Sequence, residues 1–446
     1  MTDHLDLSRI TKAFTDTGHL SFAEAEARLK AVRLTVVISA DDIRTPAGQA
    51  CVLTVLATAG RTFGHLTLVA VIDAPLIRRQ PSSHTLYEFA LAHGVHVASR
   101  SPADTTHLIA LNNVEHAAAP KAYRCWWDGW LSGVLPDWEA RRAGESWNPL
   151  AGVLAGALVV REVFADIRGV RPLKLEGNVV SLWEPWAPAS NAAHGPSTVY
   201  LARAMTIVGL GHLGQALLWN LALLPGHGDC LVLHDYQTAG AENAPTGLLT
   251  TSHDIGERKT RIAGKWIEYF GWQTAFVERK FMSWVKAEPD DPAVVISALD
   301  KPEPRKRVLA AGFHRMLDIG VGHGPVDFEI GQLRSFVAGE PSTWSEQNNE
   351  ANVDTRLEHK AYRVLNDPCG AFQLASASVA VPFVGAALGA LCVAQLLRLG
   401  AMKGIPSLLQ IELTAPEMPS FSPPSAGGPP GFGCVEIDLL RASGST

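Results

Sequence analysis

Short apolar stretches alternate with stretches of mixed polarity along the chain, and the alternation occurs twice. Apolar runs of this length are typical of buried strands, and segments with apolar residues at helical spacing lie between them. The expected strands are 34–38, 66–72 and 107–111 in the first half, and 205–208, 230–233 and 293–296 in the second. Strands that alternate with helices predict an α/β protein with a parallel sheet in each half.

Each half ends in a helix of small and apolar residues, and the two helices match without a gap. The first reads Pro149-Leu-Ala-Gly152-Val-Leu-Ala-Gly156-Ala-Leu, and the second reads Pro382-Phe-Val-Gly385-Ala-Ala-Leu-Gly389-Ala-Leu. Small residues four positions apart lie on one face of a helix, where they allow close packing on a neighbour. The repeat therefore predicts two Rossmann-like α/β domains in tandem.

The two copies differ in length, and this difference sets the expected domain boundaries. The first strand lies 114 residues before the proline in the first half (Thr35 to Pro149) and 176 residues before it in the second (Thr206 to Pro382). Part of the excess, roughly sixty residues, is the polar stretch 340–360, which indicates a mobile loop. We expect domains at 1–170 and 201–413, a connection at 171–200, and a Pro/Gly-rich tail at 414–446 that contains a short strand at 435–439.

Composition and charge exclude several classes of function. Hydrophobic residues make up 47% and charged residues 18% of the 446 residues, which is typical of a folded globular protein. The net charge of -6 gives no general attraction for phosphate backbones, so we expect no nucleic-acid partner. The six cysteines include no CxxC pair, so we expect neither zinc nor a disulfide framework, and a cytoplasmic location fits.

One apolar segment, 375–399, is long enough to suggest a membrane span. Pro382 and Gln395 interrupt it, and it contains one copy of the repeated helix. We therefore expect a buried core helix after a short extended piece, and no membrane partner. The charged N-terminus has no apolar region typical of a signal peptide.

A glycine motif follows the first strand of the second half. Gly209-Leu-Gly211-His-Leu-Gly214 comes directly after 205–208 and opens an expected helix at 215–224. Glycines in this context allow a tight turn and bring phosphate close to the backbone amides at a helix N-terminus. Asp235 ends the next strand, where a carboxylate can bind ribose hydroxyls. These residues predict a nucleotide site but do not distinguish ATP from a dinucleotide.

Three further polar residues favour ATP. Asn243 lies eight residues after Asp235, Lys259 lies sixteen residues after Asn243 in a segment (254–259) that we expect to begin a helix, and Asp300 ends another expected strand. Hydride transfer needs no lysine and second carboxylate around the phosphates. Transfer at the α-phosphate of ATP does, because the charge that develops there needs a cation and Mg²⁺.

In this order and spacing, residues 204–399 resemble the ThiF/MoeB/ubiquitin-activating-enzyme superfamily. The resemblance implies that Asp235 holds the ribose, that Asn243 and Lys259 hold the phosphates, and that Asp300 holds Mg²⁺. One position departs from the family pattern, which usually has Arg three residues after the Asn; here it is Thr246. A phosphate contact must then come from elsewhere, for which Arg258 is one candidate.

The resemblance also assigns roles to a cysteine and to the first half. Cys369, just before the last small-residue helix, matches the family position that forms a thioester or persulfide. The first half has no glycine motif after its first strand, so it resembles a degenerate, inactive adenylation domain paired with the active one. In that arrangement an arginine near the N-terminus of the inactive copy reaches the partner's ATP site, and Ser8-Arg9 makes Arg9 the candidate.

By resemblance, the chain is an ATP- and Mg²⁺-dependent enzyme that adenylates the C-terminal glycine of a small β-grasp protein, ubiquitin-like or sulfur-carrying. Cys369 would then capture the acyl group, and a separate conjugating enzyme would take it on. The pattern is similar to the activating components of bacterial ubiquitin-like conjugation operons linked to phage defence. An NAD(P)-dependent oxidoreductase and a non-catalytic adaptor remain the alternatives. The sequence leaves open the carrier, the acceptor, the thioester on Cys369 and whether two copies associate.

Overall fold

The computed structural model describes residues 8–139, 144–170, 177–340, 357–363 and 375–441. Each half is built on one sheet whose first five strands, in spatial order, run parallel. The first sheet has the order β5 (His96–Ala98), β2 (His65–Ala70), β1 (Arg33–Ile38), β6 (His107–Leu111), β7 (Lys121–Asp128), β8 (Leu131–Pro136) and β9 (Asn178–Ser181). The last two strands, β8 and β9, are antiparallel to their neighbours.

The second sheet repeats this arrangement over its first seven strands and adds an eighth. Its order is β13 (Gln273–Val277), β12 (Cys230–His234), β11 (Ala204–Val208), β14 (Val294–Ser297), β15 (Arg315–Val321), β16 (Ile330–Val337), β17 (Leu408–Glu412) and β18 (Ser420–Phe421). Its first five strands in this order, from β13 through β12, β11 and β14 to β15, run parallel. Strands β16, β17 and β18 are antiparallel to their neighbours. The six strands expected from the sequence are all present, with ends that differ by one or two residues.

The helices of the described residues connect and cover these sheets. In the first half they are α1 (Ser8–Thr15), α2 (Phe22–Lys30), η1 (Asp42–Arg44), α3 (Pro46–Ala59), α4 (Leu86–Ala92) and α5 (Pro149–Arg168). In the second half they are α6 (His212–Leu223), α7 (Asn243–Thr246), η2 (Ser252–Asp254), α8 (Lys259–Glu268), α9 (Pro302–Ala310), α11 (Lys360–Arg363) and α13 (Pro382–Gly400).

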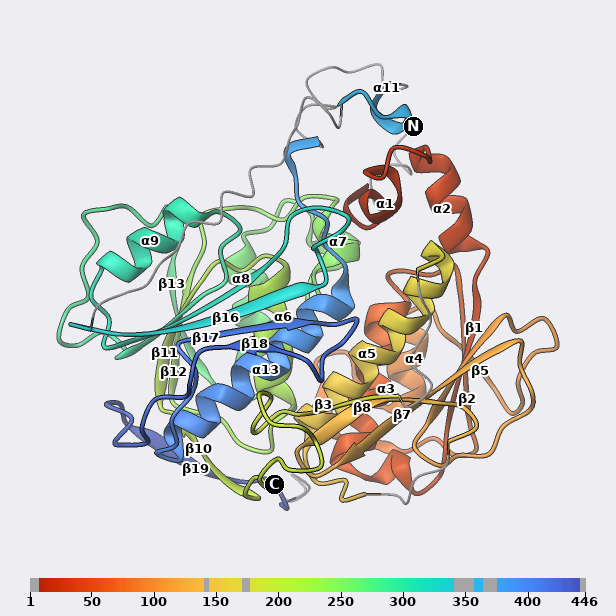
Figure 1. Cartoon of the computed structure of the whole chain (residues 1–446), viewed down its shortest axis with the longest axis horizontal. Helices are drawn as coiled ribbons and strands as arrows, with labels where there is room; N and C mark the ends of the chain where they lie inside the picture. The colour runs from red at the N-terminus through yellow and green to blue at the C-terminus, as the bar shows by residue number, and fades with distance from the viewer. Residues whose placement is uncertain (1–7, 140–143, 171–176, 341–356, 364–374, 442–446) are drawn as a thin grey trace.

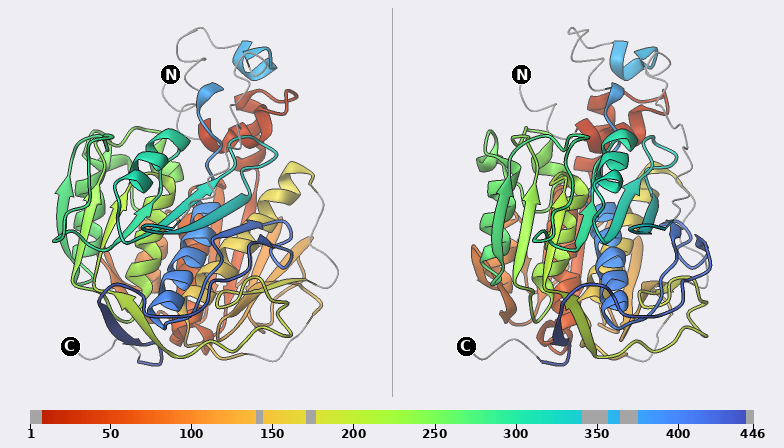
Figure 2. Two further views of the ribbon diagram at one scale, coloured as in Figure 1. Left: turned by 60° about the vertical axis from the view of Figure 1, so that its left-hand side comes forward. Right: turned by 90° about the vertical axis from the view of Figure 1, so that its left-hand side faces the viewer.

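The two small-residue helices, α5 and α13, lie side by side between the sheets (Figures 1 and 2). Both begin at the prolines of the repeat, because a proline at the first helical position gives up an N–H that has no partner within the helix. Each packs on the α-helix that follows a central strand of its own half: α5 packs on α3, which follows β1, and α13 packs on α6, which follows β11. The repeated sequence therefore corresponds to a repeated structural unit.

Helix α13 is the segment that suggested a membrane span. It is long and apolar enough to cross a membrane, but its apolar window is entirely buried inside the protein. It therefore packs as a core helix, as the sequence predicted.

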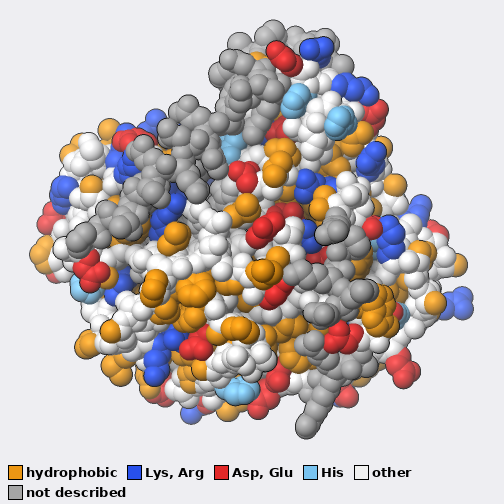
Figure 3. Space-filling view, viewed as in Figure 1, with side chains coloured by type: hydrophobic (Ala, Val, Ile, Leu, Met, Phe, Trp, Pro, Cys, Tyr) orange, Lys and Arg blue, Asp and Glu red, His pale blue; other side chains and the backbone are white. Residues whose placement is uncertain are grey.

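On the face shown in Figure 3, acidic and basic side chains are interspersed.

The connection and the tail contain more regular structure than their composition suggested. Strand β9 lies within 171–200 yet belongs to the first sheet, since it pairs with β8. In the tail, β18 pairs with β17, and the expected strand at 435–439 is β19 (Cys434–Asp438), which pairs with β10 (Thr198–Ala202). A hairpin of β3 (Pro75–Gln80) and β4 (Ser83–Thr85) completes the strands of the described residues.

Candidate nucleotide site

The glycine motif lies between β11 and α6, and each of its three glycines has a different environment. Gly209 has a φ of +92°, which favours glycine. A Cβ on Gly214 would lie 2.0 Å from the carbonyl oxygen of Gly209, so this glycine lets the helix pack on the turn. A Cβ on Gly211 would have no atom within 4 Å. The motif thus leaves open space at the N-terminus of α6, where unpaired backbone N–H groups favour an anion.

Asp235 fastens this turn to the end of the neighbouring strand. Its carboxylate is buried just after β12, where Oδ2 accepts a hydrogen bond from the N–H of Leu210 (2.8 Å) and Oδ1 accepts one from the N–H of Gln237 (2.8 Å). A carboxylate oxygen accepts more than one hydrogen bond, so both oxygens keep capacity for a ribose hydroxyl. Asp235 therefore orders the turn and remains available to a ligand.

Lys259 is the first residue of α8, so the expectation that the helix begins at Asp254 was wrong. Residues 251–254 form their own capped turn, η2, and Gly256 with a φ of +91° separates it from α8. The Lys259 ammonium is buried and donates to Oε1 of Gln237 at 2.8 Å. Burial lowers the pKa of Lys259, and the carboxylates of Asp235, Glu242 and Asp300 oppose that shift. Lys259 therefore lies near Asp235 and Asp300, which the sequence predicted, and near Glu242.

Arg9 comes from α1 in the first half, yet it lies at the site of the second half. Its guanidinium donates from Nε to the carbonyl oxygen of Ser378 (3.1 Å) and from Nη2 to the Ser378 hydroxyl (2.8 Å). Burial lowers the pKa of Arg9, and the nearby carboxylates of Asp300 and Glu242 oppose this. Helix α1 contacts α7, as Figure 1 shows. The structure thus brings Arg9 and Lys259 to the same carboxylates.

Helix α7 carries Asn243 and the position at which the family usually has arginine. Asn243 is buried at the start of the helix, where its Oδ1 accepts a hydrogen bond from the N–H of Gly240 (2.9 Å). Thr246 is buried and donates to the carbonyl oxygen of Glu242 (2.7 Å), so it offers nothing to a phosphate. Arg258, the candidate substitute, is exposed and donates to the carbonyl oxygen of Tyr236.

Asp300 lies three residues after β14 and is exposed. The carboxyl ends of β11, β12 and β14 meet at one edge of the sheet, which brings Asp300 near the glycine turn and Lys259. One exposed carboxylate beside a phosphate site suits Mg²⁺, which binds one or two carboxylates together with phosphate oxygens and water. The residues present therefore fit the ion expected from the sequence.

Cys369 and residues 341–356 of the loop predicted at 340–360 lie outside the described residues, so the thiol and most of that loop stay sequence predictions. Conversely, the sequence missed three residues that contact the site: Gln237, Glu242 and Ser378. Gln237 follows Asp235 by two residues and Glu242 directly precedes Asn243, but neither belongs to a motif. Ser378 lies a few residues before α13. No pattern in the chain signals them, because tertiary contacts alone bring them together.

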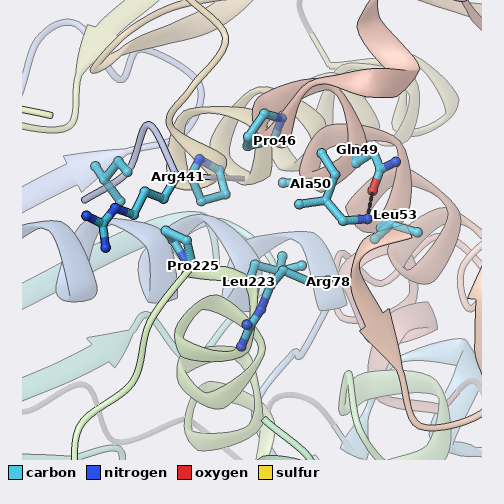
Figure 4. A pocket seen from close by; sticks show the side chains of 11 residues that line it. Pro46, Gln49, Ala50, Leu53, Arg78, Leu223, Pro225 and Arg441 are labelled. Atoms are coloured by element: carbon cyan, nitrogen blue, oxygen red, sulfur yellow. Dashed lines mark hydrogen bonds between the residues drawn. The ribbon is translucent and has the colours of Figure 1, made fainter. Parts of the chain in front are cut away.

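A separate pocket lies between the halves and cannot serve as the site (Figure 4). It is lined mainly by apolar side chains, including Pro46, Ala50, Leu223 and Pro225. Its volume of about 20 Å³ holds no more than one water molecule. The open space at Gly211 is the feature that matches a nucleotide, with Arg9 near His212 of the same motif and Lys259 near Asp235.

The paired α/β halves, and the contribution of the first half to the site of the second, define a protein of the E1-like, ubiquitin-activating class. The family of the BilD C-terminal domain matches residues 201–403, and that of the BilD N-terminal domain matches residues 33–179. A curated relative, the bacterial E1-like protein BilD of Collimonas sp. (strain OK412), is 31% identical over 411 residues, which cover 89% of each chain. The chain belongs to this BilD family of bacterial E1-like proteins, which confirms the resemblance inferred from the motifs.

Solved structures of E. coli MccB are also similar, but more weakly. MccB with ATP is 14% identical over 52% of this chain and 65% of that chain, with a TM-score of 0.36. MccB with AMPCPP and selenomethionine MccA is 14% identical over 54% of this chain and 64% of that chain, with a TM-score of 0.33. This chain thus spans less than two thirds of those solved chains.

Proposed function

We propose that this E1-like protein uses Mg²⁺-ATP to adenylate the C-terminal glycine of a small β-grasp protein, ubiquitin-like or sulfur-carrying. One observation carries the proposal: Arg9, held by Ser378, and Lys259, held by Gln237, come from different halves, and the carboxylates of Glu242 and Asp300 oppose the lowering of both pKa values by burial. An arginine and a lysine beside the glycine motif suit ATP better than a dinucleotide. Transfer at the α-phosphate develops negative charge that cations stabilise, whereas hydride transfer to a nicotinamide develops no charge on the phosphates.

The reaction gives each residue a role. The space at Gly211 admits the phosphates to the N–H groups of α6, and Asp235 binds the ribose. The carboxylate of the carrier attacks the α-phosphate and releases pyrophosphate. Lys259 and Arg9 stabilise the negative charge that develops on the phosphate oxygens. Asp300 would hold Mg²⁺, which supplies further charge neutralisation.

We propose that the first half is a degenerate copy of the same adenylation domain. Its sheet has the same strand order, but β1 leads into η1 and not into a glycine turn. Asp42 there is buried and accepts hydrogen bonds from Ser39 (2.7 Å) and Asn112 (2.9 Å). A Cβ on Gly48 would lie 2.0 Å from the Asp42 carbonyl oxygen, the same close approach that Gly214 makes to Gly209, but no glycine stands between β1 and α3 to match Gly211. The first half would then serve the site of the second through Arg9.

The later step is proposed from the sequence. The thiolate of Cys369 attacks the acyl-adenylate, forming a thioester and releasing AMP, and a separate conjugating enzyme accepts the acyl group. We place this chemistry in the cytoplasm, within a bacterial conjugation system of the kind linked to phage defence. A carrier adduct that hydroxylamine removes, and that Cys369→Ala abolishes, would support the thioester.

Calorimetry tests the nucleotide, with Mg²⁺-ATP compared with NAD⁺ and NADP⁺. We expect ATP to bind and Lys259→Ala or Asp300→Ala to weaken it at least tenfold, or about 1.4 kcal/mol. Lys265→Ala, from an exposed position on the same helix, and Asp290→Ala, also exposed, should leave binding unchanged.

Two other outcomes point to the alternatives. Binding of a dinucleotide without ATP would reject the proposal in favour of an oxidoreductase. ATP binding without pyrophosphate release in the presence of β-grasp proteins encoded near the gene would indicate a non-catalytic adaptor.

A further inference from the structure

Arg61 is a second arginine of the first half that contacts the nucleotide-binding region of the second. It follows α3 directly and is partly buried. Its Nε donates to the carbonyl oxygen of Ala244 (3.2 Å), and its Nη2 donates to that of Leu248 (3.0 Å). Its Nη1 donates to the carbonyl oxygen of Ala57 in its own half (2.9 Å). The guanidinium therefore ties the end of α3 to α7 and the residues after it.

Helix α7 needs such support. A helix of four residues is too short to be stable alone, because its few hydrogen bonds do not offset the cost of starting it. The helix nevertheless carries Asn243 and follows Glu242, which with Asp300 is one of two carboxylates that act on both Arg9 and Lys259. The segment after it is fixed from its own half, since Oε1 of Gln215 accepts hydrogen bonds from the backbone N–H groups of Leu249 and Thr250.

The charge of Arg61 is met by backbone and not by a carboxylate. Among the described residues no acidic side chain offsets its burial, which lowers the pKa of Arg61 to about 10. The side chain thus stays charged at neutral pH and faces carbonyl oxygens at the C-terminal end of α7, where a cation is favourable. A guanidinium reaches several carbonyls at once through its planar fork, whereas a lysine ammonium cannot reproduce that geometry.

We propose that Arg61 is a positioning residue for the nucleotide site: it fixes α7 and thereby places Asn243 and Glu242. This inference rests on the proposed function. On α7 itself the family's arginine is replaced by Thr246, whose hydroxyl bonds within the helix. The first half thus supports the site twice, with Arg9 at the ligand side and Arg61 behind α7.

The full-length chain allows a matched test. Arg61→Met keeps the aliphatic length but removes the donors, and Arg61→Lys keeps the charge. Arg78→Met is the control, because Arg78 also belongs to the first half and donates to a carbonyl of the second, that of Ala222 in α6 (3.0 Å). Hydrogen exchange at residues 243–250 without ligand, and calorimetry with Mg²⁺-ATP well below the melting temperature of every variant, are the two measurements.

We expect Arg61→Met to speed hydrogen exchange at residues 243–250 and to weaken the binding of Mg²⁺-ATP about tenfold. Arg61→Lys should have smaller effects on both. Arg78→Met should change neither, even where it lowers the melting temperature equally. Unchanged exchange at 243–250, or the same loss of ATP affinity in Arg78→Met, would overturn the inference. If the unmodified chain binds no ATP while Arg61→Met still speeds exchange, the proposed function fails and the fixing of α7 by Arg61 is upheld.

Discussion

At the residue scale, the glycine motif separates ligand binding from folding. A methyl group at Gly211 enters open space, so Gly211→Ala should change the free energy of unfolding by no more than about 1 kcal/mol, the range of N-cap substitutions. A methyl at Gly214 meets the Gly209 carbonyl oxygen at 2.0 Å, so Gly214→Ala should destabilise the fold by about 1–3 kcal/mol.

Both variants should weaken Mg²⁺-ATP binding at least tenfold, Gly211→Ala because the methyl occupies the space of the phosphates. Urea denaturation and calorimetry measure the two quantities on the same preparations. Normal ATP affinity in Gly211→Ala would show that the ligand does not approach the backbone there.

Single residues also mark how far the sequence could predict the site. The sequence singled out Asp235 and Asp300 because each follows a strand, and Lys259 by its spacing of sixteen residues after Asn243; the structure places the three near one another. Ser378 could not be found, because its contact with Arg9 spans 369 positions of the chain and follows no spacing rule. The contact of Arg61 with α7 likewise depends on how the two halves pack.

At the element scale, the repeated glycines explain why α5 and α13 lie so close to their neighbours. A Cβ on Gly152 would lie 2.0 Å from the Ala47 carbonyl oxygen in α3, and one on Gly389 would lie 2.7 Å from the Ala216 carbonyl oxygen in α6. Side chains at these positions would force the helices apart. The pairing of α5 with α3 is thus the structural counterpart of α13 with α6.

Gly152→Ala tests this packing. We expect a loss of about 1–3 kcal/mol in the free energy of unfolding, since the clash is with backbone that has little room to move. The loss should appear even though alanine favours a helix interior over glycine by roughly 1 kcal/mol. Gly428→Ala, which adds a methyl where no atom lies within 4 Å, is the control, and urea denaturation is the measurement. Equal stability of both variants would contradict close packing of α5 on α3.

The elements that the sequence predicted well are those with continuous apolar character. Strands such as β6 and β14 are buried along their whole length and stand out from their surroundings. The edge strands do not stand out in this way. Strand β13 is exposed or half-buried throughout, and β5 has only three residues. The sequence therefore predicted three adjacent parallel strands of each sheet, but it missed the edge strands and also interior strands such as β7 and β15.

At the scale of the whole molecule, the two halves share one hydrophobic core. Buried residues of both sheets belong to a single cluster, in which Phe164 of α5 meets Phe383 of α13 with ring centroids 5.4 Å apart. A buried ion pair also crosses the interface, from Nε of Arg161 to Oε1 of Glu329 at 2.8 Å, and Arg168 lies 3.6 Å from the same carboxylate. This shared core and ion pair hold the first half against the second.

We therefore expect the chain to unfold in one calorimetric transition, and Glu329→Ala to shift that transition without splitting it. Removing the carboxylate takes a partner from Arg168 and leaves Arg161 with Glu162 (2.9 Å), at a cost of at most about 3–5 kcal/mol. Asp229→Ala is the control, because its ion pair with Arg203 has both side chains more than half exposed (60% and 55%) and contributes at most about 1 kcal/mol. Two transitions, with only one sensitive to Glu329→Ala, would mean that the halves fold independently. The support that α1 and Arg61 give to the site would then depend on docking after folding, and not on a common core.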